Sequence, residues 1–134
     1  MAALIDHAAF VGLLAAELPE VVAEFDECSR RLLHCEMATV ARCTAAAAGA
    51  GDWVTVRRHL AFVDRVHRAA DPDVNNAVYV SYMECLPLWG EPDDPPDLRA
   101  LLPVGLAGVL WDMEGREFDW PPVPRPVSPI RGQL

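Results

Sequence analysis

Lysine is absent from this sequence, in which all eleven basic residues are arginine. Together with the many alanines, this usage points to a GC-rich bacterial gene. Basic charge of any kind is scarce, because the eleven arginines face twenty carboxylates and leave a formal net charge of −9. An acidic surface repels nucleic acid and anionic membranes, and it favours basic partners. Residues 71–134 hold four arginines against eleven carboxylates, so this part carries −7 of the charge.

Long apolar runs are also missing. Although 52% of the residues are hydrophobic, no stretch reaches the ~18 uninterrupted apolar residues that a membrane-spanning helix needs. The N-terminus lacks a basic region ahead of an apolar stretch, so no secretory signal is expected. We therefore predict a cytoplasmic protein without membrane contact. In that compartment the four cysteines should be reduced and buried: Cys28, Cys35, Cys43 and Cys85.

Catalytic and cofactor motifs are absent as well. Ser29 and Ser81 lie outside any GxSxG elbow, and the sequence has no CxxC, HxxxH or HExxH spacing for a metal ion. The glycines at 49 and 51 are followed by Asp52, whose carboxylate would repel a phosphate at that helix N-terminus. The sequence therefore predicts a protein that is not an enzyme and that needs no cofactor.

Isolated histidines and glutamates are expected to have structural roles. His59 and His67 are eight residues apart, about 12 Å along a helix, which is too far to share a metal ion. We expect them to be partly buried and hydrogen-bonded. Glu36 and Glu84 stand in apolar surroundings, and pairing with arginine is the expected role for each.

Apolar residues recur at three- and four-residue steps along most of the chain, which is the pattern of amphipathic helices. The first predicted helix, residues 4–18, has one apolar face: Leu4, Ala8, Val11, Ala15 and Leu18. Residues 21–48 contain no glycine or proline. One long helix or two would fit there. We expect two that meet near residues 33 and 34, because helices average about a dozen residues.

The clearest helix starts at Trp53, after Asp52 as its N-cap. Its expected apolar arc comprises Trp53, Val56, Leu60, Phe62, Val63 and Val66. Its expected polar arc comprises Arg57, Arg58, Asp64, Arg65 and Arg68. We therefore expect this helix to bury one side and to show arginines on the other.

Two more helices are expected before the C-terminal tail. One follows the cap formed by Asp71, Pro72 and Asp73 and ends before Pro87, although residues 78–82 have β-prone side chains. The other runs from Leu98, or from after Pro103, to about residue 113. Its inward positions should be Leu106, Val109, Leu110 and Met113.

Proline divides the C-terminal part of the chain. Residues 91–97 read EPDDPPD and predict a rigid acidic connector. Five of the nine residues 121–129 are proline, which predicts an extended, polyproline-like tail. The predicted fold class is all-α: a compact bundle of five to six helices in a domain of residues 1–118, followed by a proline-rich tail of residues 119–134.

Several segments carry a family resemblance. The stretch that begins GDWV at residues 51–54 and continues to residue 63 is similar to one recurrent segment, and residues 71–84 are similar to another. Residues 32–38 and 101–106 add to the likeness. Together they resemble an uncharacterised bacterial all-helical family (DUF7674-like) over about residues 4–115, and the tail after residue 113 departs from its pattern.

Members of that family resemble small cytoplasmic immunity-type proteins of polymorphic toxin systems. The resemblance implies a protein that masks a cognate toxin, and it implies no catalytic residue. Together with the acidity, it predicts a non-enzymatic protein-binding module whose partner is a basic protein such as a toxin domain, with no nucleic acid bound. The expected partner-binding residues are Trp89, Glu91, Asp93, Asp94, Asp97, Trp111, Asp112, Glu114, Glu117, Asp119 and Trp120.

Two other interpretations stay open from the sequence. One is an intracellular adaptor or scaffold whose proline-rich tail docks on another protein. The other is a helical domain that binds a metal ion or small molecule at His34, Cys35 and Glu84. The oligomeric state does not follow from the sequence.

Overall fold

The computed structural model describes residues 3–27, 29–95 and 97–117. Within them lie six α-helices: α1 (His7–Glu17), α2 (Pro19–Val22), α3 (Leu33–Gly49), α4 (Trp53–Ala69), α5 (Pro72–Ala77) and α6 (Val104–Glu117). A π-helix, η1 (Val78–Tyr82), and two 3₁₀-helices, η2 (Met83–Cys85) and η3 (Arg99–Leu101), complete the helical segments. The described residues form no strand, so the predicted all-α bundle is confirmed. The predicted tail, residues 119–134, lies outside the described residues.

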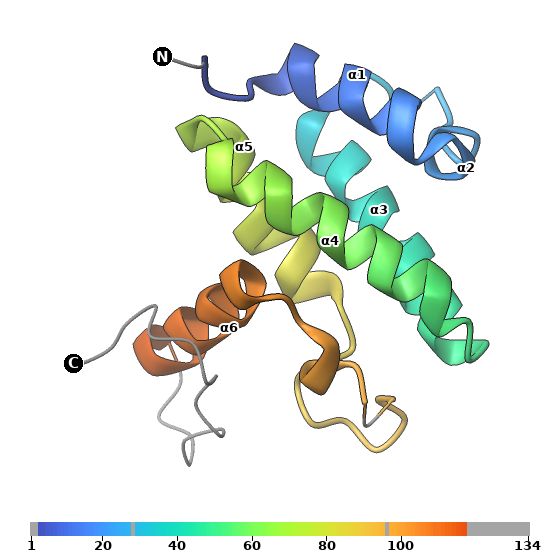
Figure 1. Ribbon diagram of the computed structural model, residues 1–134, viewed down its shortest axis with the longest axis vertical. Coiled ribbons are helices and arrows are strands. Elements are labelled where there is room, and N and C mark those ends of the chain that lie inside the picture. Colours follow the sequence, from blue (N-terminus) through green and yellow to red (C-terminus); the bar gives the residue numbers. More distant parts are fainter. Residues whose placement is uncertain (1–2, 28, 96, 118–134) are drawn as a thin grey trace.

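Helix α4 crosses the middle of the molecule, with α3 behind it, α1 on one side and α6 on the other (Figure 1). Because neighbouring helices cover α4 from several directions, its buried side chains occupy more than one face of the helix. Leu60 and Val63 are completely buried in the core, and Phe62 contacts Phe10 of α1 with the ring centroids 6.3 Å apart. The core is therefore organised around α4.

The polar arc predicted for α4 is wrong at Asp64, which is 4% exposed. One of its carboxylate oxygens accepts a hydrogen bond from the backbone N–H of Leu106 at 3.0 Å, near the start of α6. The other pairs with Arg68 at 2.8 Å. Asp64 therefore satisfies an amide at the N-terminus of α6, a task that arises only once the two helices pack together.

The apolar face predicted for the first helix is correct at Leu18, which is fully buried, and at Val11, which packs against the core, but it is wrong at the other three positions. Leu4 is 59% exposed, and Ala8 and Ala15 lie on the surface. The buried side chains of α1 are Phe10 and Leu14. Nearly every residue of α1 is apolar, so the three- and four-residue spacing of apolar residues cannot identify which face of the helix is buried. The bulkiest side chain is buried because its burial removes the largest apolar area from water.

Three helices begin after an aspartate cap, as predicted for Asp52 and Asp71. Asp6, Asp52 and Asp71 each accept a hydrogen bond from the backbone N–H three residues later, at 2.9, 3.2 and 2.8 Å. Such caps each contribute about 0.5–2 kcal/mol to stability. Ile5 and Ala70 form a parallel bridge, which places the starts of α1 and α5 side by side.

Residues 23–27 and 29–32 lie outside the helices, so α3 begins at residue 33 as expected, but the helix expected to run up to that point ends at Val22. Arg31 has a φ of 71°, in the left-handed region that residues with a Cβ rarely adopt. Its backbone N–H donates to Glu36 at 2.9 Å, and the other oxygen of Glu36 lies 2.5 Å from Nε2 of His7. Glu36 is 2% exposed and pairs with a histidine, so the expectation of an arginine partner is wrong.

Candidate functional site

The acidic connector predicted from the sequence lies at the surface. We call its carboxylates Glu91, Asp93, Asp94 and Asp97 the acidic loop. Glu91, Asp93 and Asp97 are exposed, and Asp94 is half-buried because its carboxylate accepts the backbone N–H of Glu91 at 2.9 Å. The loop follows Gly90, whose φ of 85° allows the chain to turn after Trp89. Glu91, Asp93 and Asp94 are thereby held in one turn, and Asp97 follows in the next.

The two described tryptophans of the predicted partner site are half-buried. Trp89 packs against the core at the base of the acidic loop, and Trp111 lies on α6. Each leaves part of its ring accessible. A tryptophan beside exposed charge is the kind of residue that often anchors a protein interface.

The two carboxylates predicted on α6 are engaged inside the molecule. Glu114 is 6% exposed, and Arg99 donates to its two oxygens at 2.9 and 3.3 Å. Asp112 is 9% exposed and accepts the Tyr79 hydroxyl at 3.3 Å. Of the other three predicted residues, Glu117 ends α6 with its side chain outside the description, and Asp119 and Trp120 lie beyond the described residues. Of the predicted partner-binding acids that the structure describes, the exposed ones therefore all lie in the acidic loop.

Arginine is scarce in the sequence on either side of the acidic loop. Arg99 is the only arginine between Arg68 and Arg116 in the sequence. Its guanidinium pairs with Glu114 and also donates to the backbone carbonyl of Leu88. Among the described side chains, no ion pair involves the acidic loop. Its charge is therefore presented outward.

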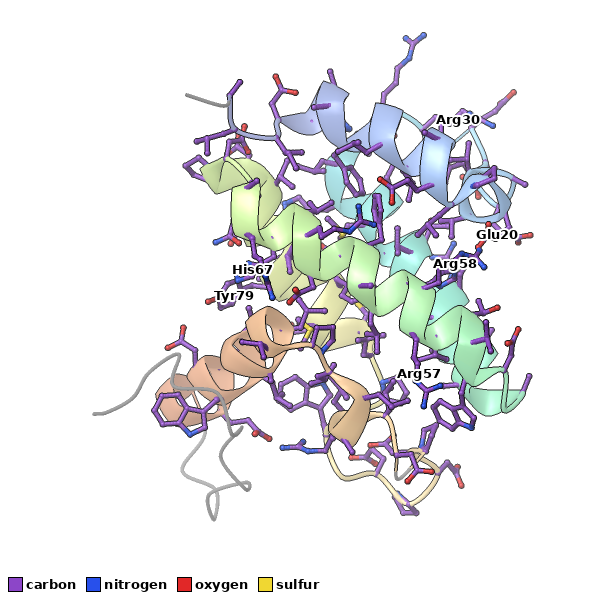
Figure 2. All side chains as sticks on the ribbon, in the orientation of Figure 1. Glu20, Arg30, Arg57, Arg58, His67 and Tyr79 are labelled. Carbon is purple, nitrogen blue, oxygen red and sulfur yellow. The ribbon has the colours of Figure 1, made fainter. Side chains whose placement is uncertain are left out.

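Figure 2 shows a contrasting surface on the other side of α4, where charges are paired. Arg58 and Glu20 point toward one another and form a salt bridge between α4 and α2. Arg65 pairs in the same way with Glu17. These contacts use arginines of the expected polar arc to attach the first two helices to α4.

A buried polar network lies beneath these pairs. His59 is 1% exposed; its Nε2 lies 3.0 Å from Glu20, and its Nδ1 lies 3.2 Å from the hydroxyl of Thr44. Burial, with a smaller contribution from Arg58, lowers the pKa of His59 to about 4. The Tyr82 hydroxyl, 3.0 Å from that of Thr44, is also fully buried, and burial raises its pKa. The expected hydrogen-bonded histidine is confirmed here.

The alternative site at His34, Cys35 and Glu84 does not form a metal centre. Nδ1 of His34 lies 2.6 Å from the Ser81 hydroxyl, while Cys35 and Glu84 are exposed. No group of three His, Cys, Asp or Glu residues in the described part of the chain could hold a metal ion.

The described cysteines are free thiols, but the expectation of burial is wrong for two of them. Cys35 and Cys85 are exposed and Cys43 is half-buried, and Cys28 lies outside the described residues. Burial raises the pKa of the Cys43 thiol, which disfavours the reactive thiolate.

Two clefts open between helices. One, of about 470 Å³, lies where the N-termini of α1, α3 and α5 meet, and its lining includes Asp6, His7, His34 and Asp73. The other, of about 410 Å³, lies between α4, η1 and α6. Neither cleft was predictable from local patterns, because each is formed by residues from three segments.

Comparisons with known proteins place the chain in a family. The model of the domain of unknown function DUF7674 matches residues 11–115, from α1 to α6. Neither the curated proteins nor the solved structures contained a match. No described helix is long and apolar enough to cross a bilayer. The chain belongs to the DUF7674 family.

Proposed function

We propose that this protein is a non-enzymatic binding module of the immunity type, which works in the cytoplasm and neutralises a basic toxin by covering its active site with an acidic surface. The observation that carries this proposal is the acidic loop. Three of its four carboxylates are exposed, and Arg99, the one arginine between Arg68 and Arg116 in the sequence, pairs with Glu114 and donates to Leu88. A basic protein partner would supply the missing counter-charge.

Electrostatic complementarity suits this task for a kinetic reason. Between Asp71 and Gly115 the sequence holds nine carboxylates and one arginine. A field of that sign steers a basic protein into contact and can raise association rates to about 10⁸–10⁹ M⁻¹s⁻¹ at low salt. An inhibitor that must capture a toxin before it acts benefits from such rates.

Order in the loop adds to affinity. The Asp94 carboxylate accepts a hydrogen bond from the backbone N–H of Glu91 and so stabilises the turn. The prolines at 92 and 95 restrict the backbone further. Binding therefore costs less conformational entropy than it would with a flexible acidic segment. Trp89 at the base of the loop supplies apolar area next to the charges.

The first test is capture of the partner. The tagged protein should retain one basic protein from an extract of its native cells at low salt, as identified by mass spectrometry, and should release it as salt rises. Retention of nothing specific, or of a partner whose binding ignores salt, would contradict the proposal.

Charge-neutral variants then locate the surface. We expect Glu91→Gln, Asp93→Asn and Asp97→Asn together to slow association with the captured partner about tenfold at low salt and far less at high salt. The matched control neutralises three exposed carboxylates elsewhere, Glu24→Gln, Glu27→Gln and Asp73→Asn. Equal slowing in both triple variants would show that net charge, and not the acidic loop, governs binding.

A further inference from the structure

We propose that the cleft where α1, α3 and α5 begin binds a free α-amino acid with an apolar side chain. The cleft measures about 470 Å³, within the ~300–1,000 Å³ typical of small-molecule sites. The starts of α1 and α5 lie side by side, joined by the bridge between Ile5 and Ala70 (Figure 1), and the first residues of α3 complete the lining. No residue of the acidic loop lines the cleft, so this binding is independent of partner capture.

The wall formed by α3 offers backbone donors. This helix begins at Leu33 and, unlike α1, α4 and α5, has no side-chain cap. No described group accepts a hydrogen bond from the backbone N–H of Leu33, His34 or Cys35, and the first two of these residues line the cleft. Glu36, in the same turn, is buried and bonds to His7 instead of capping the helix. Unpaired N–H groups at the positive end of a helix can bind a carboxylate.

The wall formed by α5 offers acceptors. Asp73 and Asn76 are three residues apart in the sequence, so they share one face of the helix. Both are exposed, and neither side chain forms a hydrogen bond or ion pair with the described part of the chain. Asp6 and Asp71 also line the cleft, and each uses only one carboxylate oxygen as a helix cap. An ammonium group carries three donors and can bond to several of these oxygens.

The two walls together select a ligand that carries both charges. The three aspartates disfavour a simple anion, whereas the uncapped start of α3 is the positive end of its helix dipole and disfavours a simple cation. The aspartates do not converge on a metal ion, since no group of three potential ligands in the described residues could hold one. An α-amino acid has its ammonium and carboxylate groups on one carbon, so it can satisfy both walls at once. Ala8 and Leu33 supply apolar area for its side chain.

Nuclear magnetic resonance of the full chain tests the proposal with three matched probes. L-Leucine carries both charges, N-acetyl-L-leucine lacks the ammonium group and L-leucinamide lacks the carboxylate. At about 1 mM, the range expected for so small a ligand, leucine should shift the amide signals of residues 6–8, 33–35 and 71–76. Each of the other two probes should bind about tenfold more weakly, because one wall of the cleft loses its charged hydrogen-bonding partner. Equal binding by either of them would overturn the proposal.

A substitution on α5 addresses the ammonium end of the ligand. Asp73→Asn removes a charge but no helix cap, so it should weaken leucine about tenfold and leave N-acetyl-leucine no weaker. Asp93→Asn is the matched control, because it changes the net charge equally but lies in the acidic loop, outside the cleft. It should leave leucine binding unchanged. Equal weakening by both variants would mean that net charge, and not the cleft, attracts the ligand.

A substitution before α3 addresses the carboxylate end. Leu32 is the N-cap residue and is 53% exposed, so Leu32→Asp leaves the core intact and adds the cap that α3 lacks. The new carboxylate should raise the melting temperature and, by occupying the N–H groups, weaken leucine about tenfold. Leu32→Ala is the control and should bind leucine as the wild type does. Absence of the leucine-induced shifts, or full leucine binding by a stabilised Leu32→Asp variant, would overturn the proposal whatever the result of partner capture.

Discussion

Protonation of His59 should destabilise this protein at mildly acidic pH. Burial lowers its pKa from 6.5 to about 4 in the folded protein, whereas the unfolded chain keeps the ordinary value. Between these two pH values the unfolded state binds a proton that the folded state does not. The free energy of unfolding must therefore fall as pH falls from about 6.5 to about 4.

The magnitude follows from the shift and from the neighbours of the ring. A difference of about 2.5 pKa units corresponds to about 3.5 kcal/mol at ~1.4 kcal/mol per unit. Glu20, 3.0 Å from Nε2, would stabilise an imidazolium and offsets part of this cost, although it also pairs with Arg58. We therefore expect a loss of about 1–3 kcal/mol that is due to His59 alone.

Urea unfolding followed by tryptophan fluorescence at several pH values measures this loss. His59→Gln removes the titrating group, so the stability of that variant should fall less than that of the wild type across the same window. Val63→Ala is the control, since it removes buried apolar volume but no titrating group, and its stability should fall with pH in parallel with the wild type. Parallel profiles for wild type and His59→Gln would refute the reasoning.

Two further predictions concern packing around α6. Gly105→Ala places a Cβ 2.5 Å from the Asp64 carboxylate and should cost about 1–3 kcal/mol in thermal unfolding, whereas Gly115→Ala, in open space on the same helix, should be neutral or stabilising. Arg99→Met leaves Glu114 buried without its partner and should cost about 3–5 kcal/mol, and adding Glu114→Leu should restore most of it. A double variant as unstable as Arg99→Met would mean that the ion pair is not the source of the loss.

Local signals were enough to predict the helical frame. Asp52 and Asp71 stand before their helices as caps, and Pro87 follows the end of a helical run, because each acts on backbone groups within a few residues. The β-prone residues 78–82 became helical, as expected from the cap upstream. Their π-helical form was not predictable from these signals.

Burial was less predictable, because it depends on partners from distant segments. Asp64 looks like a surface residue in its own helix and is buried only because α6 needs an acceptor for the N–H of Leu106. Glu114 looks like part of an acidic surface and is buried because Arg99 reaches it from η3. The exposed acids of the candidate site were predicted where proline and charge prevent regular structure, in the acidic loop.

Arg99 links the stability of this region to its charge. It lies two residues after the last carboxylate of the acidic loop, and its guanidinium reaches back to the carbonyl of Leu88 before the loop. The same group pairs with Glu114 on α6, so both ends of the loop are tied to one helix. An arginine used in this way closes the loop without neutralising it, because its charge is matched by a buried glutamate. The acidic loop can therefore be ordered and strongly negative at once, which a basic partner that recognises a fixed pattern of charge requires.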